Sequence, residues 1–166
     1  MNRMPKSLND ITDDRSREVL EYTILKKENL RSVASHRHSF LELSFITGGA
    51  GEETVNGERH PLARGSFTLL LPCHVHEIHS SPSDPLQLYN IAVSFKQIFG
   101  LSDDFGLKDL LLLPGKNPSP FFQMPPSVTG KTENIMADML EEYTRKKPWS
   151  DTCLLYTSDA ADDLLC

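Results

Sequence analysis

The sequence has few cysteines, no long apolar run and no excess of basic residues. Its three cysteines, Cys73, Cys153 and Cys166, are an odd number at irregular spacing, which excludes a disulfide framework and a zinc site built from paired Cys-x-x-Cys motifs. No segment approaches the roughly 18 apolar residues of a membrane-spanning helix, and residues 1–17 are polar without a hydrophobic signal segment. The 17 basic residues are outnumbered by 23 acidic ones, which argues against a broad surface for nucleic acid or membrane. We therefore expect a cytoplasmic globular protein.

The length of 166 residues is that of one domain, and the composition changes along it. Residues 1–17 offer few side chains to bury, which predicts a flexible N-terminal arm. Residues 18–100 are rich in β-forming residues, whereas residues 101–152 combine a proline-rich loop with a helical pattern. We therefore expect a mainly β domain followed by an amphipathic helix.

The final segment, residues 153–166, has the character of a cloning remnant. From Cys153 it reads Cys-Leu-Leu-Tyr-Thr-Ser-Asp-Ala-Ala-Asp, which resembles, residue for residue, the translation of the transposase adaptor used in sequencing libraries. The alternative is a genuine short helix whose apolar face is formed by Leu154, Leu155, Leu164 and Leu165. We expect the native sequence to end near Thr152 in this chain, with the gene truncated there.

Seven short runs rich in β-branched and aromatic residues alternate with turn residues, which predicts an antiparallel sandwich or barrel. The runs are Val19–Leu25, Phe40–Thr47, Glu52–Val55, Arg59–Ala63, Ser66–Leu71, Val75–His79 and Leu86–Phe95. Asn56-Gly57 is the strongest hairpin signal, because a two-residue type I′ turn needs positive φ at both central positions.

After residue 100 the pattern changes from strands to helices. Leu107–Leu113 is predicted as a short helix, and Gly115–Pro126, with four prolines, as a loop. Residues 132–147 repeat apolar side chains at every third and fourth position, with Ser127 or Thr129 as the predicted cap.

The apolar stripe of this helix must be buried. It either lies on the outside of the sheet or pairs with a second copy of itself as a dimerisation helix. The stripe consists of Ile135, Met136, Met139, Leu140 and Tyr143.

Four residues, His36, His38, Glu42 and His76, have side chains of the kinds that bind metals or ligands. The first three are separated by even numbers, so on one strand they project to the same face, together with Phe40. The opposite face is apolar and consists of Leu41, Leu43 and Phe45. If the imidazoles and the carboxylate converge inside a barrel, they suit a divalent metal such as Zn, Fe, Mn, Ni or Cu. The alternative is a set of polar residues that line a pocket and hydrogen-bond a ligand or one another.

The order and spacing of these residues resemble a known family. His36-x-His38-x3-Glu42-x6-Gly49, followed by Gly65-x6-Pro72-x3-His76, resembles the two motifs of the cupin superfamily. The stretch from His36 to Gly51, with Asn56-Gly57 and the run from Gly65 to Pro72, resembles the N-terminal sensor and dimerisation domain of AraC-type transcriptional regulators. The resemblance covers about residues 18–147. Leu30 stands where the first cupin motif usually has glycine, and His76 arrives one residue earlier than in the second.

The resemblance implies a jelly-roll β-barrel that binds a small effector, often a sugar or related metabolite, in a pocket containing His36, His38, Glu42 and His76. It implies no catalytic activity and no required cofactor, although a divalent metal at the same four residues is compatible with it. The late helices would pair two subunits into a homodimer in the full-length protein. DNA would be contacted only through a C-terminal helix-turn-helix domain, which is missing from this chain.

Two other functions fit the same residues. A small metal-dependent cupin enzyme, of dioxygenase, isomerase or decarboxylase type, would use the four side chains as ligands and keep an open position for water. A bare binding module would be complete without any DNA-binding domain.

Overall fold

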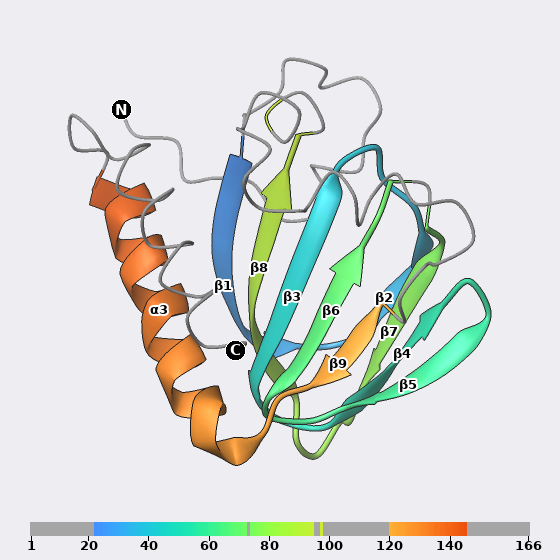
Figure 1. Cartoon of the computed structure of the whole chain (residues 1–166). Helices are drawn as coiled ribbons and strands as arrows, with labels where there is room; N and C mark the ends of the chain where they lie inside the picture. Colours follow the sequence, from blue (N-terminus) through green and yellow to red (C-terminus); the bar gives the residue numbers. More distant parts are fainter. Residues whose placement is uncertain (1–21, 73, 95–96, 98–119, 146–166) are drawn as a thin grey trace.

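The computed structural model describes residues 22–72, 74–94, 97 and 120–145, which form two antiparallel sheets and the helix α3 (Figure 1). The first sheet has the order β1-β8-β3-β6-β9, with β1 at Tyr22–Leu30, β8 at Leu86–Val93, β3 at Leu41–Gly48, β6 at Ser66–Leu70 and β9 at Phe121–Gln123. The second has the order β2-β7-β4-β5, with β2 at Val33–His36, β7 at His76–Ser80, β4 at Gly51–Val55 and β5 at Glu58–Leu62. Helix α3 spans Pro126–Arg145.

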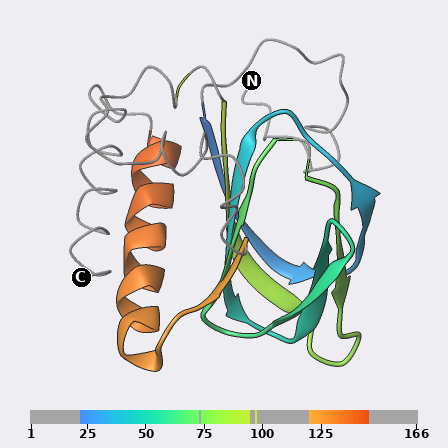
Figure 2. The same cartoon turned by 45° about the vertical axis from the view of Figure 1, so that its right-hand side comes forward.

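The two sheets face each other and α3 lies outside the first sheet (Figure 2). The chain passes repeatedly from one sheet to the other, since β1, β3, β6 and β8 belong to the first and β2, β4, β5 and β7 to the second. This arrangement is a jelly-roll barrel of the cupin type followed by an amphipathic helix, which confirms the predicted fold class. In the described part of the chain, no helix is long and apolar enough to cross a membrane.

Two of the strands were not predicted. Strand β2 has only four residues, none of them fully buried, so it lacks the alternation that marks a strand in sequence. Strand β9 lies inside the segment Gly115–Pro126 that was predicted as a loop. Its three residues pair with Ser66, Phe67 and Thr68 of β6. The strand therefore forms through pairing with a neighbouring strand, and its local sequence does not predict it. The Asn56-Gly57 hairpin is confirmed, with φ of 50° and 87°.

Helix α3 begins six residues earlier than predicted, and the predicted cap is wrong. Pro126 is its first residue, a position where the missing N–H carries no penalty. Thr129 lies inside the helix and donates its hydroxyl to the carbonyl of Pro125, 3.0 Å away. Glycine is a poor helix former, so the presence of Gly130 explains why the sequence pattern did not predict a helix over its first residues.

The apolar stripe of α3 covers the outside of the first sheet, the first of the two predicted alternatives. Its members pack against Ile24 and Ile91, and the ring centroids of Tyr143 and Tyr22 are 5.7 Å apart. The packed members are Met136, Met139, Leu140 and Tyr143. Ile135 is partly buried and stands outside this cluster. Pairing of the helix with a second copy stays a prediction.

The interior of the barrel divides into an apolar and a polar part. Its apolar cluster consists of Ile46, Leu62, Ile78, Leu86 and Leu88. On β3 and β7 the polar residues Glu42 and His76 precede Ile46 and Ile78 by even steps, so they share the inner face but lie nearer one end.

Several predictions concern residues outside the described ranges. These are the arm at residues 1–17, the short helix Leu107–Leu113, Cys73 and the segment 153–166.

Candidate functional site

The four predicted site residues come from both sheets. His36 is the last residue of β2, His76 is the first of β7, and Glu42 is the second of β3. His38 lies in the segment that crosses from β2 to β3. The prediction that His36, His38 and Glu42 share one strand is therefore wrong, because the chain changes sheets between them.

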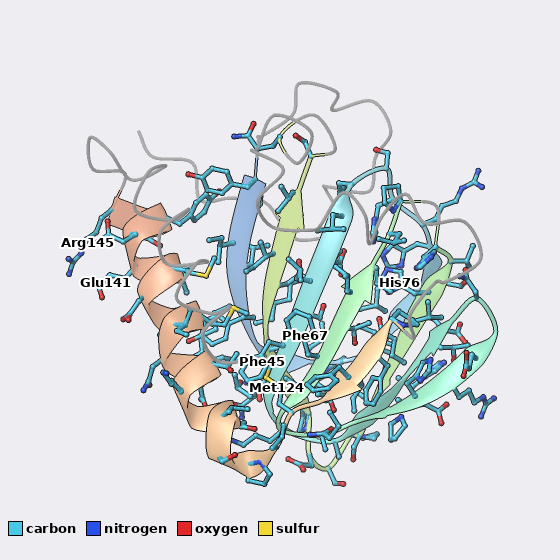
Figure 3. All side chains as sticks on the ribbon, in the orientation of Figure 1. Phe45, Phe67, His76, Met124, Glu141 and Arg145 are labelled. Carbon is cyan, nitrogen blue, oxygen red and sulfur yellow. The ribbon has the colours of Figure 1, made fainter. Side chains whose placement is uncertain are left out.

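The crossing nevertheless brings the imidazoles together at the inner wall of the second sheet. The ring centroids of His36 and His76 are 4.2 Å apart, and those of His38 and His76 are 5.4 Å apart. Figure 3 shows His76 on the second sheet, on the side of the barrel away from α3. Phe40, which was predicted to share a face with the histidines, stacks on His38, and their ring centroids are 4.2 Å apart.

Three of the four residues form a compact buried set. His38, Glu42 and His76 each offer one ligand atom, and these atoms lie within 4.8 Å of one another. The residues are 7%, 3% and 2% exposed. Glu42 Oε2 is 3.2 Å from His38 Nε2. Two imidazole nitrogens and a carboxylate at this spacing are a donor set that borderline divalent metals accept.

The hydrogen bonds behind the two imidazoles fix which nitrogen carries the proton. His38 Nδ1 lies 2.8 Å from the carbonyl of Phe40, which can only accept, so Nδ1–H is the donor. His76 Nδ1 lies 3.0 Å from the Glu53 carboxylate, which also accepts. In the neutral rings Nε2 therefore carries a lone pair. Metal-binding histidines are oriented by partners of this kind.

The Nε2 atoms of His38 and His76 are buried and have no hydrogen-bond partner among the described residues. The 3.2 Å contact of His38 Nε2 with Glu42 does not have hydrogen-bond geometry. A buried polar atom without a partner costs about 1–3 kcal/mol. Two such lone pairs facing one carboxylate fit a bound metal ion, because coordination would satisfy both.

The Glu42 carboxylate is held in its ionised form. Burial alone raises the pKa of Glu42, but the contact with His38, the positive charge that His38 and His76 carry when they are protonated, and the amide of Asn90 together lower it below its usual value. Asn90 Nδ2 donates to Glu42 Oε1 over 2.8 Å. The carboxylate is therefore charged at neutral pH, as a metal ligand must be.

His36 occupies the rim of this site. It is half-buried, and its Nδ1 donates to the carbonyl of its near neighbour Ala34 over 2.9 Å. Burial is the main cause that lowers the pKa of His36, and the charges of His76 and His38 lower it further. His36 is not among the three residues whose ligand atoms converge.

Two residues of the site were not predicted. Glu53 orients His76, and Asn90 holds Glu42. Asn90 is the one amide side chain in the run Leu88–Val93 of β8, where its neighbours are aromatic or aliphatic, a pattern that could have singled it out. Glu53 stands between polar neighbours in β4, and nothing in its local sequence distinguishes it from the half-buried Glu52.

Comparison with known proteins places the chain among ligand-binding domains. The family model described as the AraC-like ligand binding domain matches residues 19–158, a range that contains both sheets and α3. Comparison with curated proteins gives no match. Among solved structures, a cupin protein from Bacteroides fragilis is 23% identical with a TM-score of 0.41, covering 51% of this chain and 74% of that one. A cupin 2 conserved barrel domain protein from Salinispora arenicola is 19% identical with a TM-score of 0.40, covering 48% and 66%. A DMSP lyase from Ruegeria pomeroyi is 17% identical with a TM-score of 0.38, covering 45% and 38%.

Proposed function

The chain belongs to the family of AraC-like ligand-binding domains, and from that premise we propose that it is the effector-sensing and dimerisation domain of a transcription regulator. Its barrel binds a small metabolite, and a separate helix-turn-helix domain contacts DNA. The acidic charge balance supports this division of labour, because a net charge of −6 does not favour binding to phosphates.

The observation that carries the proposal is the pair of unsatisfied Nε2 atoms beside an ionised carboxylate. A domain that served only as a structural spacer would gain stability by replacing His38 and His76 with apolar residues of similar volume. Retaining two costly buried lone pairs is physically reasonable where a ligand satisfies them.

A divalent metal fits this donor set. His38 Nε2, His76 Nε2 and Glu42 would hold the ion, while Glu53 and the Phe40 carbonyl orient the imidazoles. The metal would supply an open coordination position for an oxygen atom of the effector. In the absence of metal, the same nitrogens and the carboxylate would hydrogen-bond the effector directly.

The connection from the barrel to α3 suggests how binding is transmitted. Gln123 of β9 accepts a hydrogen bond from Ser66 Oγ over 2.9 Å and donates to the Arg64 carbonyl over 3.1 Å. Arg64 also contacts Glu133 of α3 at 2.9 Å. A change in the barrel wall at β6 would therefore reach the first turns of α3 through β9. An effector would shift the equilibrium between two arrangements of the barrel wall and α3 only if it bound the two arrangements with different affinities.

Dimerisation belongs to the same proposal. Four members of the apolar stripe are engaged with the first sheet, so a partner helix would contact Ile135 and the outer edges of the stripe. Glu141 and Arg145 form an ion pair on α3 (Figure 3).

Electrophoretic retardation tests the regulatory role. We expect the 166-residue chain to leave DNA from upstream of its own gene unshifted. A longer protein, read from an independent genomic clone past codon 152, should shift that DNA. Retardation of specific DNA by the 166-residue chain would refute the division between sensing and DNA-binding domains.

A metal-dependent enzyme is the second candidate, because the buried donor set would equally support catalysis. It would leave a coordination position for water or substrate, with the metal acting as a Lewis acid. Turnover of a substrate that requires stoichiometric metal and disappears in His38→Ala and His76→Ala variants would favour the enzyme over the sensor.

A further inference from the structure

A fourth imidazole lies beside the binding centre, in the segment that leads into β7. His74 precedes His76 by two residues and is half-buried. Burial is the main cause that lowers the pKa of His74, and the positive charge that His38 and His76 carry when protonated lowers it further. Charges act in this way only over short distances. His74 therefore adjoins the centre, although it is not among the three residues whose ligand atoms converge.

A turn of the backbone holds the His74 ring in one tautomer. The His74 backbone N–H donates to the Leu71 carbonyl over 3.1 Å, and the Leu71 N–H donates to His74 Nδ1 over 3.3 Å. A backbone N–H can only donate, so Nδ1 is an acceptor and carries no proton. In the neutral ring the proton is then on Nε2, which makes Nε2–H a hydrogen-bond donor.

The other three imidazoles around the centre have the opposite tautomer. His36, His38 and His76 each face a carbonyl or carboxylate acceptor at Nδ1, so their Nε2 atoms carry lone pairs. A lone pair can bind a metal ion, whereas a protonated Nε2 cannot. The hydrogen bonds thus sort four neighbouring histidines into three that can act as ligands and one that can only donate.

The Nε2–H of His74 is available to a bound molecule. Within the described part of the chain, the hydrogen bonds of His74 are the two to Leu71, and neither uses Nε2. Nε2 is also not among the fully buried atoms without a partner, so it is accessible. A donor beside the centre can therefore bind an acceptor group of a molecule that occupies the centre.

The charges favour an anionic acceptor once a divalent metal is bound. The ion would add two positive charges, which the carboxylates of Glu42 and Glu53 offset. Lys27 lies on the inner face of β1, because it pairs with Leu88 of the apolar cluster. Burial lowers the pKa of Lys27, and the charge of Glu42 opposes this effect by stabilising the ammonium form. This ammonium leaves the metal-loaded interior with an excess of positive charge, which attracts an anion.

We propose that His74 is the specificity-determining donor of an anion subsite, where its Nε2–H hydrogen-bonds a carboxylate or similar anionic group of the molecule held at His38, Glu42 and His76. The subsite rests on the proposed function, because it needs the three-residue set to hold a metal ion. It adds the charge of the group that is bound and a residue that recognises this group without being a metal ligand.

Two substitutions of His74 separate the roles of its two nitrogens. His74→Asn places an amide oxygen where Nδ1 accepts the Leu71 N–H, but it is too short to replace the Nε2–H donor. His74→Gln is long enough to place an amide N–H near the position of Nε2. His79→Asn is the matched control, because His79 is exposed on the outer face of β7.

The experiment titrates the cobalt-loaded proteins with acetate, azide and acetamide. The visible absorption of Co²⁺ reports a change in its ligands, and acetamide is the uncharged counterpart of acetate. We expect every variant to bind one equivalent of Co²⁺ with the affinity of the wild type. Acetate and azide should bind His79→Asn like the wild type, His74→Asn about tenfold more weakly, and His74→Gln with intermediate affinity. Acetamide should bind all of them much more weakly than acetate.

Several results would contradict the subsite. Equal affinity of acetate for the wild type and His74→Asn would exclude the donor, and acetamide binding as tight as that of acetate would exclude selection by charge. Loss of Co²⁺ in His74→Asn, as expected for His76→Ala, would show that His74 is itself a ligand. Each of these results retains the proposed function. Absence of Co²⁺ binding by the wild type would overturn the subsite together with the metal centre, and DNA retardation tests the regulatory role separately.

Discussion

Glu53 Oε1 lies 3.0 Å from Nδ1 of His76, and both side chains are 1% exposed. The carboxylate fixes the tautomer in which the Nε2 lone pair of His76 faces Glu42 and His38. Glu53 is buried in β4 and is not one of the three residues that could hold a metal, but it orients His76, which is one of them.

Glu53→Gln should therefore weaken divalent metal binding while leaving all three ligands in place. An amide can present its NH₂ group to Nδ1 and thereby favour the wrong tautomer. We expect zinc affinity to fall about 10- to 100-fold, as is usual when such an orienting partner is removed. Competition titration against a chromophoric chelator measures the change. Glu52→Gln is the matched control, since Glu52 is the preceding residue of β4 and pairs with the exposed Arg59; equal affinities in the two variants would refute the orienting role.

Glu42 should make the metal-free protein sensitive to acid. Its pKa in the folded state lies below the ordinary value of 4.5. A lowered pKa means that the ionised carboxylate contributes stability fully above about pH 4.5, and that this contribution is lost as the pH falls through the lower folded value. Urea unfolding of the wild type and Glu42→Gln between pH 7 and pH 3, with chelator present, measures it. We expect the wild-type advantage in unfolding free energy to shrink with falling pH. An advantage that stays constant to pH 3 would mean that the carboxylate is not held ionised.

Gly65, which lies against residues of the junction between β9 and α3, should cost more stability to replace than Gly57. Gly57 and Gly65 have nearly the same φ, 87° and 88°. A Cβ at Gly57 meets nothing within 4 Å, whereas at Gly65 it lies 2.9 Å from both Gln123 Nε2 and Thr129 Oγ1. We expect Gly57→Ala to lose about 1–2 kcal/mol for its left-handed backbone. Gly65→Ala should lose about 1–3 kcal/mol more, because it displaces the contact between β9 and α3. Urea unfolding compares the two variants. Equal losses in the free energy of unfolding would show that the contact between β9 and α3 adapts to the extra methyl group without loss of stability.

The fold class was within reach of sequence because its signals are local. The Asn56-Gly57 turn needs no tertiary partner, and the alternation in β3 places Leu41, Leu43 and Phe45 opposite Glu42. The stripe of α3 has a period of its own, so the helix was found although its first turn was missed. Strand β9 has no comparable signal, since its order comes from pairing with β6.

The site was predicted for a partly mistaken reason. Even spacing on one strand was expected to align His36, His38 and Glu42, but a crossing between sheets brings His38 and Glu42 together instead. The spacing cannot distinguish these geometries, because both place the residues close in space. Glu53 was not singled out, since it becomes notable only through its contact with His76 on the neighbouring strand β7.

The central claim of this account is that His38, Glu42 and His76 form one binding centre. Isothermal titration of the chelator-treated protein with Zn²⁺ tests it most directly, with wild type, His38→Ala, His76→Ala and the rim variant His36→Ala compared after circular dichroism has shown that each is folded. The account predicts one equivalent of Zn²⁺ per chain for the wild type and His36→Ala, and loss of that equivalent in His38→Ala and His76→Ala. No stoichiometric binding by the wild type, or equal binding by all four proteins, would contradict it.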